Sequence, residues 1–134
     1  MKWHQVMREV IAVVAADPVL SGLYPTIRLQ GSGDLAPEVL EYALIADSET
    51  EQWAPVVLQF DQWCRTMPEL ARSEQRLRRM FHLDLPATFG AVQMWAQYVD
   101  GDSLASPDRD GYFARAIRFR FTPLRDLYDP APTL

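Results

Sequence analysis

Three side chains of this sequence, Cys64, His4 and His82, are of the types that most often act as a nucleophile or a base near neutral pH. Nucleophilic catalysis needs a base beside the nucleophile and a third group that orients this base. Neither histidine belongs to a G-x-S-x-G elbow or lies beside a glycine-flanked cysteine. Both are therefore interpreted as polar residues of helices or helix ends, and we expect that the protein is not an enzyme.

Metal ligation is disfavoured by the same residue counts. One cysteine and two separated histidines cannot supply the donors of a structural zinc site. The stretch "DGDSLASPDRDG" contains four aspartates, Asp100, Asp102, Asp108 and Asp110. It has Leu104 and Gly111 where a calcium loop would require oxygen ligands. We expect a solvated acidic loop, disordered over residues 100–111 in the isolated subunit, and neither a metal nor a cofactor.

A glycine-rich segment, "QGSGDL" at residues 30–35, is the remaining candidate for a ligand site. It lacks the lysine and the hydroxyl residue of a phosphate-binding loop. We expect it to form a turn with a positive φ at Gly31 or Gly33.

The composition is typical of one ordinary globular domain spanning residues 1–134. The chain is 49% hydrophobic and 23% charged, and a chain of this length can bury a core. Its formal net charge of −5 repels phosphate backbones and anionic lipid, so any contact with nucleic acid would have to be local. Arg8 and Glu9 interrupt the N-terminal apolar stretch, which argues against a leader peptide. The single cysteine allows no internal disulfide and favours a reducing compartment. We expect a soluble protein.

The stretch "YFARAIRFRFT", residues 112–122, has the alternation of a half-buried strand. Its apolar side is formed by Phe113, Ile117, Phe119 and Phe121. Its opposite side is formed by Tyr112, Ala114, Ala116, Arg118 and Arg120. Aromatic, small and guanidinium groups in this combination suit a protein contact as well as a phosphate contact. Arg115 falls on the apolar side, where it needs a carboxylate partner or a position near the end of the strand.

Two tryptophans fall on the sides of their predicted strands that are opposite the apolar residues. If helices cover the apolar sides, Trp63 and Trp95 lie on the face that the helices leave open. Two interpretations remain, a core of irregular register or a contact between copies, for which tryptophan and arginine are favoured. Under the second interpretation the candidate interface residues are Tyr112, Arg118, Arg120, Trp63, Trp95, Asp102 and Asp108.

The other elements follow from periodicity and capping signals. A first helix is predicted to end before Asp17-Pro18, followed by a turn in "ADPVLSGLYP" and a short extended piece. Thr66 and Glu69 have capping-box spacing before a second helix, with Pro68 in its first turn. Four strands are predicted, at 41–50, 54–65, 90–99 and 112–122. The expected fold is α+β, a mostly antiparallel sheet of about four strands with two helices packed on one face.

This order of elements resembles the tail-completion, or tail-terminator, proteins of long-tailed bacteriophages and gene-transfer particles. The resemblance covers nearly the whole chain and is carried by several stretches in order. These are the first helix running into "AADPVLSGLYPTIRL", the strand entry "APEVLEYALIADSET", the strand and helix of "APVVLQFDQWCRTMPELARSEQRLRRMF", and the closing strands "AVQMWAQYVDGDS" and "GYFARAIRFRF". The chain departs from the family pattern in the glycine-rich stretch 28–37 and in the long loop between the last strands.

The resemblance implies a structural protein of the virion, assembled in the host cytoplasm and located at the head-proximal end of the tail. Copies would form a ring, a hexamer as in the family, that closes the tail tube and joins the head–tail connector. The implied partners are further copies of the chain, the tail-tube protein and the neck protein. DNA would pass through the ring without sequence-specific binding.

Three alternatives remain open. Another ring protein of the neck or of head completion would rely on the same surfaces. A nucleic-acid-binding regulatory module would use five arginines, Arg72, Arg76, Arg79, Arg118 and Arg120. Its signature would be steep salt-dependent binding to DNA. An enzyme or a binder of small ligands would require a deep pocket with convergent polar groups.

The interface hypothesis predicts the outcome of reversing two charges. We expect Arg118→Glu combined with Arg120→Glu to leave the monomer folded and to weaken self-assembly or tail docking. Circular dichroism and light scattering measure the two properties separately. Unchanged association would remove this face from the interface.

Overall fold

The computed structural model describes residues 2–31, 38–46, 55–103 and 111–124. Three helices and six strands are formed, in the order α1 (Lys2–Ala16), α2 (Pro18–Leu23), β1 (Thr26–Leu29), β2 (Val39–Ala46), β3 (Val56–Cys64), α3 (Met67–Phe81), β4 (Ala87–Phe89), β5 (Val92–Ser103) and β6 (Phe113–Pro123). In this part of the chain no helix has the length and apolar character needed to cross a bilayer.

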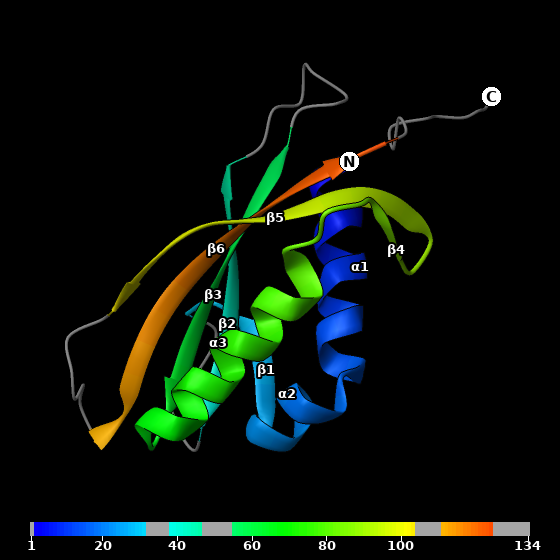
Figure 1. Cartoon of the computed structure of the whole chain (residues 1–134). Helices are drawn as coiled ribbons and strands as arrows, with labels where there is room; N and C mark the ends of the chain where they lie inside the picture. The colour runs from blue at the N-terminus through cyan, green and yellow to red at the C-terminus, as the bar shows by residue number, and fades with distance from the viewer. Residues whose placement is uncertain (1, 32–37, 47–54, 104–110, 125–134) are drawn as a thin grey trace.

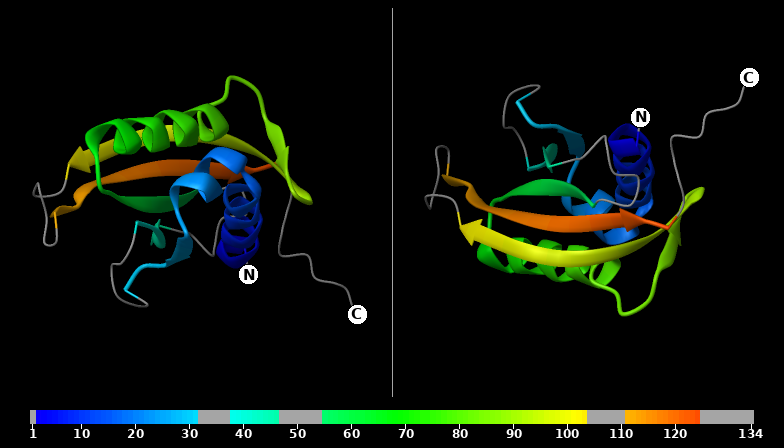
Figure 2. Two further views of the ribbon diagram at one scale, coloured as in Figure 1. Left: turned by 90° about the horizontal axis from the view of Figure 1, so that it is seen from below. Right: turned by 90° about the horizontal axis from the view of Figure 1, so that it is seen from above.

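The strands form a single sheet in the order β1-β2-β3-β6-β5-β4. The β1–β2 pair is parallel and the other four pairs are antiparallel. The long strands β5 and β6 are bent, and the sheet coils into a half-barrel (Figures 1 and 2). Helix α3 packs against β3, β6 and β5, and α1 packs against β3 and β4.

The predicted sheet of about four mostly antiparallel strands with two helices is therefore wrong, since the sheet is mixed and has six strands and three helices accompany it. The two missed strands, β1 and β4, have four and three residues, too few for an alternating pattern to stand out. Because antiparallel strand pairs are more common than parallel pairs, the sequence-based prediction did not include the parallel pairing of β1 with β2.

The missed helix, α2, lies in the segment interpreted as a turn. Asp17 is its N-cap, and the carboxylate accepts a hydrogen bond from the N–H of Leu20 at 3.1 Å. Pro18 occupies the first turn, where a proline lacks no useful donor. These start signals were present in the sequence, but a helix of six residues has little periodicity to support them.

The core lies between the helices and one face of the sheet, as predicted for β6. Ile117, Phe119 and Phe121 are fully buried, and Phe113 is half-buried beside them. Phe81 of α3 lies against both Phe119 and Phe121, with ring centroids 5.6 and 5.2 Å apart. Burial of each large side chain of this kind contributes about 1.5–3 kcal/mol to the free energy of unfolding.

Several local predictions are confirmed. The first helix ends at Ala16, and the Thr66 side chain accepts a hydrogen bond from the Glu69 N–H at 3.3 Å as the N-cap of α3. Gly31 has a φ of 77°. The prediction of disorder over residues 100–111 is wrong at its beginning, because β5 continues to Ser103. Residues 104–110 lie outside the described part of the chain.

One ion pair fastens α2 to α3. The guanidinium of Arg76 donates to Asp17 from Nε at 2.9 Å and from Nη2 at 2.5 Å. The Asp17 side chain is only 5% exposed. The hydrogen bond from Arg76 holds the pKa of Asp17 below its ordinary value of 3.8, so folding is favoured when this carboxylate is charged.

This pairing predicts part of the acid sensitivity of the fold. A carboxyl group whose pKa is lower in the folded than in the unfolded state stabilises the protein above its unfolded pKa, and this stability is lost as pH falls. At pH 7 we expect Asp17→Asn to lower the free energy of unfolding by about 1–3 kcal/mol. Between about pH 5 and pH 2 the wild type should lose stability toward the level of the variant. Urea titrations at several pH values measure this convergence, and parallel curves would contradict it.

Candidate functional site

The candidate site is the sheet face opposite the core, called here the helix-free face. Register assigns the residues that share it. In β6 they are Ala114, Ala116, Arg118, Arg120 and Thr122, and their partners are Val57, Gln59, Asp61 and Trp63 of β3 and Trp95, Gln97, Asp100 and Asp102 of β5. Period-two alternation places these side chains on the side away from Phe119 and Phe121.

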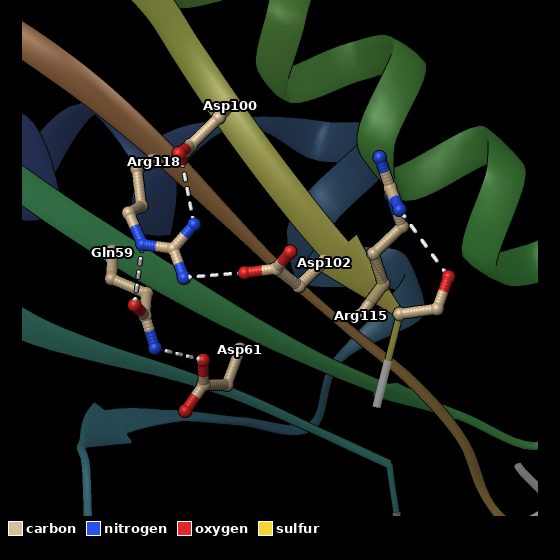
Figure 3. A network of polar contacts seen from close by, with 7 residues as sticks. Gln59, Asp61, Asp100, Asp102, Arg115 and Arg118 are labelled. Carbon is tan, nitrogen blue, oxygen red and sulfur yellow. Dashed lines mark hydrogen bonds and ion pairs between the residues drawn. The ribbon is translucent and has the colours of Figure 1, made fainter. Parts of the chain in front are cut away.

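Arg118 joins the three central strands on this face (Figure 3). Its guanidinium donates to Asp100 at 2.6 Å, to Asp102 at 2.8 Å and to the side-chain oxygen of Gln59 at 3.0 Å. The hydrogen bonds to Asp102 and Asp100 raise the pKa of Arg118 above its ordinary value. The Arg118 side chain is only 22% exposed, and one planar cation therefore fixes β5, β6 and β3 relative to one another.

The polar network continues from Gln59 toward the β1 edge. The amide of Gln59 donates to Asp61 at 2.8 Å, and the amide of Gln30 donates to Asp61 at 2.5 Å. Beyond it, Arg28 of β1 pairs with Glu41 of β2 at 3.1 Å. Buried carboxylates need such donors, because desolvation would otherwise be costly. The face is therefore organised by contacts within the chain.

A β-bulge brings the two aspartates of β5 onto this face. Tyr98 pairs with Phe119 and Asp100 pairs with Arg118, so Val99 has no partner in the register. One extra residue inverts the alternation of the strand. Before the bulge the even-numbered residues face the core, and after it Asp100 and Asp102 face outward. The carboxylates reach Arg118 only because of this shift.

The structure brings together most of the residues named from the sequence. Trp63, Trp95, Arg118, Arg120 and Asp102 all lie on the helix-free face. Trp63 and Trp95 are half-buried, and Arg120 is exposed and donates to Gln97 at 2.9 Å. Asp102 is 69% exposed although it is paired with Arg118. Trp63 pairs with Ala114 and Trp95 pairs with Thr122, so the two tryptophans lie toward opposite ends of β6, with Arg118 and Arg120 between them.

One of the named residues, Tyr112, is buried. Tyr112 is 1% exposed, and the guanidinium of Arg65 lies over its ring at 5.0 Å from the centroid. Asp108 lies outside the described residues. Sequence reasoning missed Gln59, Asp61 and Asp100, whose role depends on pairing across strands far apart in the chain. The polar alternation in β3 was a signal for the first two.

The exceptional position of Arg115 is resolved by a carboxylate, as expected. Its Nε donates to Glu74 of α3, and its Nη1 donates to Ser103 at 3.3 Å. The arginine therefore connects the ends of β5 and β6 to the helix on the core side. Of the α3 arginines considered above for nucleic-acid binding, Arg76 pairs with Asp17, whereas Arg72 and Arg79 are exposed.

The groups first considered for catalysis are held in structural contacts. Burial raises the pKa of the Cys64 thiol to about 11, so the thiol is protonated at neutral pH. Its sulfur lies 3.2 Å from the hydroxyl of Tyr24. His82 accepts a hydrogen bond from the Tyr98 N–H at 3.0 Å through Nδ1. Among the described residues no three His, Cys, Asp or Glu side chains are grouped as metal ligands.

Comparison with known proteins shows a similarity of fold. No protein-family model and no curated protein matches the sequence. The structure is similar to a solved chain described as "Virion of native gene transfer agent (GTA) particle", with a TM-score of 0.61 and 10% identity. The similarity covers 85% of this chain and 90% of that chain. It establishes that the two chains share a fold over almost their whole length.

The network gives Arg118 and Arg120 different roles. The double substitution of Arg118 and Arg120 described above would not distinguish these roles. We expect Arg118→Ala to lower the free energy of unfolding by about 1–2 kcal/mol, because three strand contacts are lost and two of their partners are exposed. Arg120→Ala, the matched control, should change it by less than about 0.5 kcal/mol. Denaturant unfolding compares them, and equal effects would contradict the assignment of Arg118 as the structural tie.

Proposed function

We propose that this chain is a structural component of a phage-like particle and that it acts as the tail terminator, the ring that closes the head-proximal end of the tail tube. The observation that carries the proposal is the fold shared with a chain of a gene-transfer-agent virion across 85% of this chain. The order of elements that resembles tail-terminator proteins supports the narrower assignment.

The helix-free face supplies a surface suited to docking on another ring. Its polar groups are held in place before any partner arrives, so little conformational freedom is lost on binding. Trp95, Arg120 and Asp102 provide an aromatic, a cation and an anion at accessible positions. Aromatic and arginine side chains are enriched at the centres of protein interfaces. We assign this face to the contact with the tail-tube ring.

The remaining partners follow from the position in the particle. Copies of the chain form a hexameric ring, the opposite side of the ring meets the neck protein, and DNA passes through the opening. The net charge of −5 suits passage, because an acidic protein does not retain a phosphate backbone. Pairing of Arg76 and Arg118 with carboxylates also leaves fewer free cations for a nucleic-acid-binding module.

The proposal predicts rings and a tail-binding defect that can be separated from folding. Electron microscopy of the purified protein should show rings, and these should cap tail tubes of the same particle in a sedimentation assay. Trp95→Ala combined with Arg120→Glu should keep the rings and reduce tube binding at least about tenfold.

The control is Arg79→Glu, which reverses an exposed charge on the outer side of α3 and should leave tube binding unchanged. Full tube binding by the double variant would exclude the helix-free face from this contact. Rings that bind only the neck protein would assign the chain to the head side of the junction instead.

A further inference from the structure

A groove lies beside helix α1 on the side that faces β2. It has a volume of about 360 Å³, and its lining includes His4, Met7, Arg8, Ile11, Ala12 and Tyr42. The residues of α1 that fill the core, Val6, Val10 and Val14, lie on a different side of the helix. Met7, Ile11 and Tyr42 pack against the margin of the core and are only half-buried, so the groove presents apolar side-chain surface that the described residues leave partly exposed.

The neighbouring edge of the sheet extends the apolar character of the groove. Leu29 of β1 pairs in register with Tyr42 and is 49% exposed. Strand β1 is the first strand in the sheet order, so it forms an edge of the sheet and has β2 as its neighbour. One flank of the subunit thus combines an edge strand with an apolar groove.

A protruding apolar side chain lies elsewhere on the subunit. Leu85, in the connection between α3 and β4, is 73% exposed, the largest exposed fraction among the large hydrophobic residues that the structure describes. Leu83, two residues earlier, packs against the core, so the connection alternates between inward and outward side chains. Strand β4, which follows, is the last strand in the sheet order. The groove lies between α1 and β2, and Leu85 lies in the connection before β4, a strand that α1 also contacts, so the two features belong to different elements of the subunit.

The charges beside these two features are complementary. Asp84, next to Leu85, is exposed. Arg8, at the groove, has a side chain that is 61% exposed and lies 3.6 Å from Glu9. Opposite charges around an apolar contact select the partner and the orientation more than they add affinity. Leu85 with the adjacent carboxylate of Asp84 is therefore complementary, in polarity and in charge, to the apolar groove with the adjacent guanidinium of Arg8.

We propose that Leu85 of one copy inserts into the α1–β2 groove of the next copy, with Asp84 facing Arg8, and that this head-to-tail contact builds the ring. The inference rests on the proposed function and names the contact between copies that it requires. A contact between two different patches propagates around a ring, whereas a self-complementary patch yields only pairs. The helix-free face remains available to the tail tube.

A disulfide-trapping experiment tests the contact without requiring complete rings. One protein carries Ala12→Cys in the groove and the other carries Leu85→Cys, both at exposed positions. The native Cys64 is buried and does not compete. Under mild oxidation the mixture should form a covalent dimer at least about tenfold faster than either protein alone.

The control mixture pairs Ala12→Cys with Met67→Cys, an exposed apolar position on α3 that has no part in the contact. Cross-linking in the control at the rate of the test pair would overturn the proposal. So would homodimers of either single variant forming as fast as the mixed dimer, because the contact would then be self-complementary.

Charge reversal provides an independent readout. Arg8→Glu alone should weaken self-association several-fold, and Arg8→Glu combined with Asp84→Arg in the same chain should restore it. Sedimentation velocity measures both, and a double variant as weak as the single one would overturn the Arg8–Asp84 pairing.

The inference and the proposed function can fail separately. If rings cap tail tubes while the cysteine pair does not cross-link, the groove contact is wrong and the tail-terminator role stands. If the pair cross-links but the assemblies bind neither tubes nor neck protein, the contact stands and the tail-terminator role is wrong.

Discussion

The guanidinium of Arg118 is the interaction on which the helix-free face depends. It donates to side chains of β5 and β3 from its own position on β6, so three strands share one charged donor. Loss of that donor would leave Asp100 and Asp102 as unpaired neighbours of like charge on adjacent positions of one strand. The proposed docking surface, which includes Trp95 and Arg120, is built on the strands that Arg118 holds in register.

The same strand also organises the core. Phe119 and Phe121 lie on the reverse of Arg118 and Arg120 and contact Phe81 of α3. Arg115 and Glu74 join the end of the strand to the helix, and Asp17 and Arg76 join that helix to α2. In the described part of the chain the helices pack against one face of the sheet, and on the opposite face Trp95, Arg118 and Arg120 are at least partly exposed, whereas Asp61, Ala114 and Ala116 are buried. The proposed ring needs a rigid subunit that presents one surface to the tube and two different surfaces to its neighbours.

Strong local signals in the sequence were sufficient to predict β3, β6, α1 and α3. The alternation of Phe119 and Phe121 with Arg118 and Arg120, and the Thr66 cap, need no tertiary information. Prediction of the complete sheet did need tertiary information, because β1 and β4 are short strands that are stabilised by pairing with β2 and β5. The bulge at Val99 is likewise invisible in the sequence, since a single extra residue reverses the alternation only where a partner strand fixes the register. For this reason the expected acidic loop is in part a strand that carries the partners of Arg118.

The central claim is that the helix-free face becomes covered in the particle while the outer side of α3 stays accessible. Hydroxyl-radical footprinting with mass spectrometry measures it on the protein in both states. Oxidation of Trp95 should fall at least about fivefold from the free protein to the assembled tail, the decrease expected when an interface centre excludes water, while oxidation of Met67 on α3 stays constant. Equal oxidation of Trp95 in both states, together with protection of Met67, would contradict the account.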